Sequence, residues 1–201
     1  MPRCRCSAKP SIGWSARAVP ESSGCPGDSW ADISPCGAYR WRLQRRWDPG
    51  RPALLFIGLN PSRADGRRDD PTLRRLLGFA RRWGHGSLTV VNLFARISPS
   101  PAALHRCADP IGPANHDWLR QTLGEALAAP ASSRLWLGWG NGGRWRNRDQ
   151  QVLELLSAGG GGRLWALGRT ASGQPRHPLY APGSARLAPW LLAQGGKAAA
   201  S

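Results

Sequence analysis

Four apolar runs divide the chain, and each ends in glycine, proline or a polar residue. These strand-like runs are residues 54–57, 88–94, 134–140 and 163–168. Between them lie segments with apolar residues at helical spacing, namely 71–83, 115–128 and 146–158. The regular alternation of strand and helix predicts a parallel sheet with right-handed crossovers.

Local signals sharpen two of these elements. Residues 39–47 begin with alternating apolar and basic side chains, as in a strand with one wet face. Because the turn at 48–50 is short, we expect this strand to pair antiparallel with 54–57. Asp70 suits a helix N-cap, with Pro71 at the first helical position. The fold class predicted is α/β, a three-layer sandwich with a mainly parallel four-stranded central sheet preceded by an antiparallel strand.

The domain plan follows from composition. Residues 1–33 are rich in Ser, Pro, Gly and Cys without a sustained period, so we expect a poorly ordered extension. We expect a single α/β domain over 34–192 and a disordered tail over 193–201. No run of about 18 apolar residues and no secretory apolar region is present, so we expect no membrane span, a cytoplasmic location and a monomer.

The formal charge is +16, and 26 of the 28 basic residues are arginines. Arginine suits phosphate groups and stacking on bases, which points to a nucleic-acid partner, DNA first. A GC-rich coding bias would explain arginine over lysine, but not the shortage of acids. Four arginines of the 71–83 helix allow either a solvated face or a phosphate-binding one: Arg74, Arg75, Arg81 and Arg82.

Cysteine spacing gives little sign of a metal. The five cysteines are odd in number and irregularly spaced, and Cys4-x-Cys6 alone is a weak ligand pair. We therefore expect no metal site and no cofactor, with the thiols reduced and structural.

A polar or glycine-rich segment lies at the carboxyl end of each apolar run: Asn60, Asn92, Gly140-Asn141, and Arg169 leading to His177. The carboxyl ends of parallel strands share one edge of a sheet, where ligands bind in open α/β folds. Pro61 holds Asn60 in extended geometry at this edge. These segments should therefore converge on one site.

The arrangement resembles the uracil-DNA glycosylase superfamily, in the collinear order of four segments. Their sequences are Gly58-Leu59-Asn60-Pro61-Ser62, Val90-Val91-Asn92-Leu93, residues 135–140 and His177-Pro178-Leu179. The chain is closer still to the DUF1643 family of bacterial proteins of unknown function, over about 34–189. That likeness rests on 60–65, 69–72, 78–84, 91–94 and 175–180.

The glycosylase resemblance implies roles for three residues. Asn60 would hold the attacking water, Asn92 would bind the base edge, and His177 would donate to the leaving base. Substrate contacts would come from the rest of the matched segments and the strand-end loop: Gly58, Leu59, Pro61, Ser62, Asn141 and Pro178.

Further candidates come from chemistry and position rather than from the resemblance. Phe79 or Trp139 would stack on a base, and Arg63, Arg169 and Arg176 would grip phosphates. Trp145, among Arg144, Arg146 and Arg148, is another stacking and phosphate-binding candidate. Asp65 would act as a base or, with Asp69, as a metal ligand, whereas Asp70 is more simply a helix cap.

Three functions remain open at this point. Hydrolysis of an N-glycosidic bond, as in base excision during DNA repair, is the leading hypothesis, and it makes the protein an enzyme. The second is a non-catalytic protein that binds nucleic acid or a modified base. The third is a metal-dependent enzyme that acts on a nucleotide-like small molecule.

Overall fold

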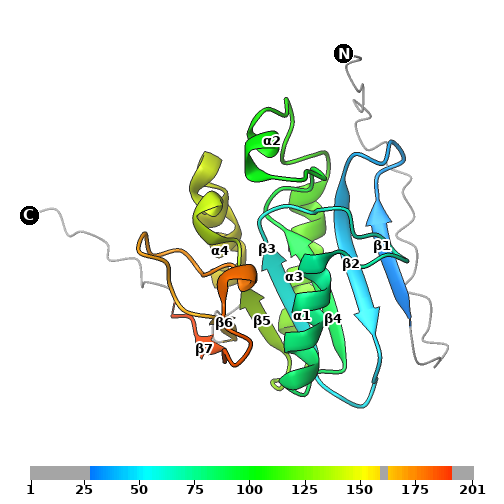
Figure 1. The fold of residues 1–201 in the computed structure, drawn as a ribbon, viewed down its shortest axis with the longest axis vertical. Coiled ribbons are helices and arrows are strands. Elements are labelled where there is room, and N and C mark those ends of the chain that lie inside the picture. Colours follow the sequence, from blue (N-terminus) through cyan, green and yellow to red (C-terminus); the bar gives the residue numbers. More distant parts are fainter. Residues whose placement is uncertain (1–27, 159–162, 192–201) are drawn as a thin grey trace, which may run out of the picture.

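The computed structural model describes residues 28–158 and 163–191, and these form one seven-stranded sheet (Figure 1). Its order across the sheet is β1 (Ser29–Ile33), β2 (Arg40–Arg46), β4 (Ser87–Asn92), β3 (Ala53–Gly58), β5 (Arg134–Leu137), β6 (Leu164–Ala166) and β7 (Ala188–Pro189). The four central strands β4, β3, β5 and β6 are mutually parallel, whereas β1, β2 and β7 extend the sheet antiparallel.

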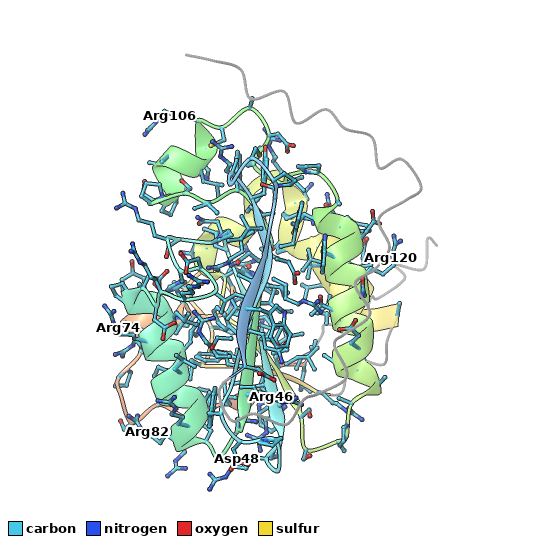
Figure 2. All side chains as sticks on the ribbon, turned by 90° about the vertical axis from the view of Figure 1, so that its right-hand side faces the viewer. Arg46, Asp48, Arg74, Arg82, Arg106 and Arg120 are labelled. Atoms are coloured by element: carbon cyan, nitrogen blue, oxygen red, sulfur yellow. The ribbon has the colours of Figure 1, made fainter. Side chains whose placement is uncertain are left out.

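Helices cover both faces of this sheet (Figure 2). One face carries α1 (Pro71–Arg82), and the other carries α3 (Asn115–Ala128) and α4 (Arg148–Ala158). Two buried apolar clusters follow from this arrangement, one centred on Leu76 and Trp136 under α1 and one centred on Leu119 and Val152. The three layers of the predicted sandwich are therefore present. None of the helices in this described part is long and apolar enough to cross a membrane.

The sheet is wider than predicted. The sequence indicated four parallel strands with one antiparallel neighbour, and the structure adds β1 and β7. Strand β1 lies inside the segment 1–33 that we expected to be poorly ordered, and it pairs with β2 from Ser29 onward. Ordered structure therefore begins before the predicted boundary. The rest of that extension and the tail at 193–201 fall outside the described residues.

The expected hairpin between β2 and β3 is wrong. Strand β2 pairs antiparallel with β4, and β3 lies on the far side of β4. The connection at 47–52 steps across two strand spacings, about 10 Å. Gly86 at the start of β4 fills the gap, since its carbonyl accepts from Trp47 and Asp48 and its N–H donates to Pro52. A Cβ on Gly86 would collide with the Asp48 carbonyl, so glycine is required there.

The predicted helices match the structure more closely than the predicted strand pairing does. Asp70 caps α1 through a 2.7 Å bond from the Leu73 N–H, with Pro71 in the first turn. Helix α3 spans the predicted residues. The expected helix from 146 begins at 148, after the 3₁₀ segment η1 (Gly140–Asn147). The stretch between the predicted strand at 88–94 and the predicted helix at 115–128 contains a further short helix, α2 (Pro101–His105).

Candidate functional site

The carboxyl ends of β3 and β4 bring Gly58 and Asn92 together. The two residues are paired in the parallel register, and Asn92 is the last residue of β4 rather than its middle. A Cβ on Gly58 would lie 2.8 Å from Asn92 Nδ2, so the absence of a side chain at 58 makes room for the amide. Asn92 is buried, and its Oδ1 finds no hydrogen-bond donor among the described residues. A buried oxygen without a protein donor is able to accept a hydrogen bond from a ligand.

The His177 loop reaches the same edge from beyond β6. Gly140 donates its N–H to the Pro175 carbonyl at 2.9 Å, and a Cβ on Gly140 would lie 3.6 Å from the His177 Cβ. Pro178 lies against Gly138, at the end of β5. The convergence predicted from the strand ends therefore holds for β3, β4, β5 and the His177 loop.

Phe56 connects the two halves of this edge. One side of its buried ring lies against Gly58, next to Asn92, and the other lies against Gly138, next to Pro178. Its ring also packs edge-on against Trp136, with centroids 4.8 Å apart. The sequence suggested only a core residue in a strand, but in the structure the Phe56 ring is packed between the residues next to Asn92 and those next to Pro178.

His177 is held in its neutral form. Its Nδ1 accepts a 3.3 Å hydrogen bond from the Leu179 N–H at the start of η2 (Pro178–Tyr180). Burial lowers the pKa of His177 to about 4. A neutral imidazole that accepts at Nδ1 carries its proton on Nε2. His177 is therefore a hydrogen-bond donor at neutral pH, and it carries no charge.

Asn60 lies beside this edge with its amide nitrogen already engaged. Nδ2 donates to the carbonyls of Pro61 and Ser98, each at 3.0 Å. These bonds fix the side chain and leave Oδ1 as the group that is able to accept from a water. The rest of the loop is structural, since Leu59 packs against Gly142 and Ser62 donates to Asp70.

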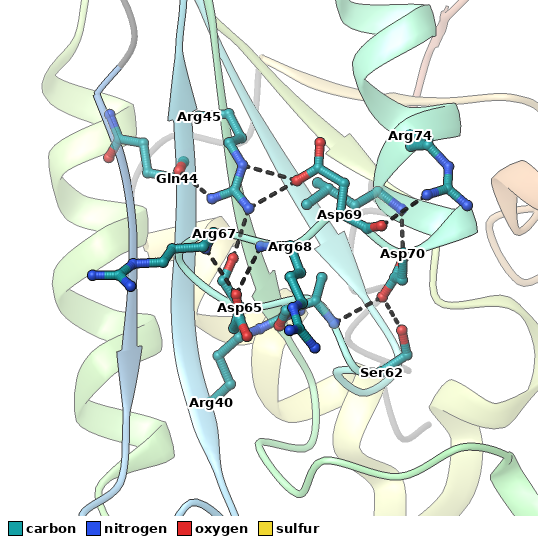
Figure 3. A network of polar contacts seen from close by, with 12 residues as sticks. Arg40, Gln44, Arg45, Ser62, Asp65, Arg67, Arg68, Asp69, Asp70 and Arg74 are labelled. Carbon is teal, nitrogen blue, oxygen red and sulfur yellow. Dashed lines mark hydrogen bonds and ion pairs between the residues drawn. The ribbon is translucent and has the colours of Figure 1, made fainter.

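Three acidic residues, Asp65, Asp69 and Asp70, form hydrogen bonds and an ion pair that hold the loop before α1 (Figure 3). Asp65 Oδ1 accepts from the Arg67 and Arg68 N–H groups, and these bonds lower the pKa of Asp65. Asp69 pairs with the buried Arg45 at 2.8 Å. Asp70 caps α1 and accepts from Ser62 and from the Ala64 N–H.

Because all three carboxylates already accept hydrogen bonds or pair within this part of the structure, we assign them a structural role. A lowered pKa makes Asp65 a weak base near neutral pH. Over residues 28–158 and 163–191, no group of three or more His, Cys, Asp or Glu side chains is placed to hold a metal ion. Cys107 donates to the Ala103 carbonyl, and Cys4, Cys6 and Cys25 lie outside the described residues.

The expected stacking residues lie in the core. Phe79 is 2% exposed and packs against Trp83 and Trp136, whereas Trp139 is 1% exposed and donates to Gln174 at 2.7 Å. Neither ring presents a face to a ligand, so we assign base stacking to neither. Helical and strand periodicity marks such positions as apolar without telling a core ring from an exposed one.

The expected phosphate contacts divide in two. Arg63, Arg169 and Arg176 are all exposed, but the Arg169 guanidinium also lies over the Trp190 ring at 3.6 Å and donates to the Gly173 and Leu191 carbonyls. Asn141 is exposed at the start of η1, where its Oδ1 accepts from Ser172.

The arginine-rich segment around Trp145 is also internal in part. Trp145 packs on Phe94 and His105, and Arg148 is 2% exposed. Arg148 Nε donates to the Leu93 carbonyl at 2.8 Å, which also accepts from Asn115. Both side chains fix the backbone just after Asn92. Sequence reasoning missed this function, because a buried arginine without a carboxylate has no local signature.

Two hollows lie near the amino ends of the parallel strands. One, of about 160 Å³, lies between the sheet and α3 beside Thr89 and Thr122, and the other, of about 340 Å³, lies beside His85, Arg134 and Trp165. Neither hollow is lined by Asn92 or His177. The candidate site is therefore defined by its polar groups at the sheet edge and not by these hollows.

Comparisons with known proteins identify the family of this chain, and the function of that family is unknown. No curated protein and no solved structure matches the chain. The profile of the family described as protein of unknown function (DUF1643) matches residues 40–179, which include Asn60, Asn92 and His177. Since this match covers more than half of the sequence, the chain belongs to the DUF1643 family.

Proposed function

We propose that this protein hydrolyses the N-glycosidic bond of a nucleobase, with the base held between Asn92 and His177. The two residues lie at one sheet edge, on either side of the Phe56 ring. Asn92 offers a buried amide oxygen that is suited to an N–H of a base, and His177 offers the Nε2 proton. The resemblance of the four strand-end segments to uracil-DNA glycosylases supports the same reaction.

The chemistry requires few protein groups. The glycosidic C–N bond breaks, and its electron pair leaves with the base, so negative charge develops on the base. Donation from His177 Nε2–H to a base oxygen stabilises that charge. Water adds to the anomeric carbon, and its proton finally resides on the released base. Asn60 Oδ1 would orient this water, since Nδ2 is fixed by the Pro61 and Ser98 carbonyls.

The hydrogen-bonded position of His177 at the sheet edge is the observation that carries this proposal. An oxyanion-like leaving group needs a donor that stays in place and in one protonation state during the reaction. The Leu179 N–H fixes the ring through Nδ1, and the lowered pKa keeps the ring neutral. A solvated loop histidine would be partly charged near neutral pH and free to rotate.

One alternative keeps the same site without hydrolysis. The Asn60 amide is bonded to two backbone carbonyls, as a purely structural residue would be. In that case Asn92 and His177 would recognise a base that is bound and released unchanged. The two functions differ in a single observable, which is whether an abasic product forms.

Base release on labelled oligonucleotides tests the proposal. Duplex and single-stranded DNA with uracil, hypoxanthine, hydroxymethyluracil or a mismatch would be incubated with the protein, and alkali would reveal abasic sites. We expect Asn92→Ala and His177→Gln to reduce cleavage by about 100-fold or more, as when an oxyanion donor is removed. His105→Gln is the matched control, because His105 is an exposed histidine on α2.

The remaining outcomes decide between the alternatives. Cleavage by His177→Gln at the wild-type rate would contradict the role of His177. Binding without cleavage on any substrate would favour the non-catalytic function. Cleavage that a chelator abolishes would instead point to the metal-dependent hypothesis.

A further inference from the structure

The outer face of α1 carries basic side chains and no acidic ones. Arg74, Arg81 and Arg82 are exposed there, and Arg75 is half-buried beside them. At 100° per residue these four side chains occupy about one third of the helix circumference, on both sides of Gly78. Nothing lies within 4 Å of a Cβ built on Gly78, so the helix backbone between the arginines is open.

Among residues 28–158 and 163–191, no carboxylate forms an ion pair with this face. Helix α1 contains no acid, and the chain has none between Asp70 and Asp109. The acids that precede the helix are engaged by the loop, with Asp69 on Arg45 and Asp65 and Asp70 on backbone N–H groups. An ordinary solvated helix face carries both signs of charge, which this one does not.

The fold places a second acid-free stretch beside the first. No Asp or Glu follows Glu154 in the sequence, and the η2 segment from this stretch packs against α1. Arg75 joins the two by donating to the Pro178 and Ala181 carbonyls. The arginine face therefore adjoins the loop that carries His177. Figure 2 shows Arg74 and Arg82 on the α1 side of the molecule and Arg120 on the opposite helix layer.

An exposed ring completes this surface. Tyr180 is 81% exposed and Leu179 is 44% exposed, two of the three large apolar side chains that the described residues expose. They stand in η2 between His177 and α1. Aromatic rings beside basic grooves are a common means of stacking unpaired bases.

We propose that the outer face of α1, together with Tyr180, binds the backbone of a nucleic-acid strand and presents one of its bases to the His177 loop. This inference rests on the proposed function for its choice of a base-containing polymer, and it makes the substrate a strand instead of a free nucleoside. Arg74 and Arg81 are seven residues apart, about 10 Å along the helix. That span corresponds to about three phosphates of one duplex strand.

Salt-dependent binding to labelled duplex DNA, without any base removal, tests this surface. Three phosphate contacts contribute a slope of about −2.7 in log K against log salt, or about 40-fold weaker binding between 50 and 200 mM salt. The triple variant Arg74→Gln, Arg81→Gln, Arg82→Gln should lose this part of the slope. Arg75 stays unchanged because it holds the η2 segment.

Matched variants separate this surface from net charge. The triple variant Arg51→Gln, Arg106→Gln, Arg120→Gln removes the same charge from exposed sites outside α1 and should keep the wild-type slope. Replacing the three α1 arginines by lysine should retain most of the slope. Unfolding curves confirm that each variant is folded. Tyr180→Ala should weaken binding to DNA with an unpaired base more than binding to a perfect duplex.

Several results would overturn the inference. Equal loss of affinity in the α1 and control triple variants would attribute binding to net charge. No binding to DNA at low salt, or stronger capture by phosphatidylserine vesicles than by DNA, would also reject a nucleic-acid surface. This test measures binding alone, so the α1 surface can be supported even if the protein cleaves no substrate. If the α1 surface is rejected, the cleavage assay still tests the proposed function of Asn92 and His177.

Discussion

Neutral His177 is the feature whose perturbation by pH is most informative. Its pKa is lowered to about 4 by burial, whereas a histidine in an unfolded chain titrates near 6.5. At pH 6 the folded protein should therefore have about 1% of His177 protonated, against about three quarters in the unfolded chain. Two-dimensional NMR of ¹⁵N-labelled imidazole rings measures this directly, and His177→Gln assigns the signal.

The same titration fixes the tautomer. Because the Leu179 N–H donates to Nδ1, the neutral ring should carry its proton on Nε2, and the two nitrogens should differ widely in ¹⁵N shift. Both shifts should stay nearly constant from pH 8 down to pH 6. The protein unfolded in urea provides the control titration. A midpoint near 6.5 in the folded protein, or a proton on Nδ1, would refute the assignment of His177 as a neutral donor.

The lowered pKa also has a consequence for stability. Between about pH 6.5 and 4 the unfolded chain binds more protons at this position than the folded protein, so the free energy of unfolding should fall as the pH decreases through this window. His85 acts in the same direction, since burial lowers its pKa as well. Stability curves therefore report both histidines together, and only the NMR titration isolates His177.

Two further predictions concern packing and capping, and urea unfolding measures both. Gly58→Ala places a methyl group 2.8 Å from Asn92 Nδ2, so it should lower the free energy of unfolding by about 1–3 kcal/mol and impair base release. Gly78→Ala, where nothing lies within 4 Å, should instead raise the free energy of unfolding by about 0.5–1 kcal/mol. Equal effects of the two substitutions would contradict the close approach at Gly58. Asp70→Ala should lower the free energy of unfolding by about 1–2 kcal/mol because it removes the α1 cap, and Asp70→Asn should retain most of it. An unchanged stability of Asp70→Ala would show that the cap contributes nothing.

Three residues stand out in the sequence: Asn60 and His177 each precede a proline, and Asn92 is a polar residue near the end of an apolar run. Their role as a group depends on contacts that no local pattern encodes, such as the Leu179 N–H on Nδ1 and the Phe56 ring between Gly58 and Gly138.

Local sequence patterns are sufficient to place the main helices and strands and the edge at which the strands end. Helical spacing and the Asp70-Pro71 cap gave α1, and apolar runs gave the four parallel strands, because these signals act over a few residues. The parallel arrangement in turn brings Asn92 and the end of β3 to one edge. The DUF1643 resemblance over about 34–189 is likewise a property of the sequence.

Which elements pack against one another depends on contacts between residues far apart in the sequence. Strand β4 lies between β2 and β3, although the short turn favoured a direct hairpin, because pairing across a sheet depends on contacts between distant residues. The same long-range packing buries Trp139 and Arg148 and occupies the three acids of the loop before α1. It also sets two acid-free stretches of sequence side by side, as α1 and η2. Composition records the charge, but only the fold determines where that charge lies.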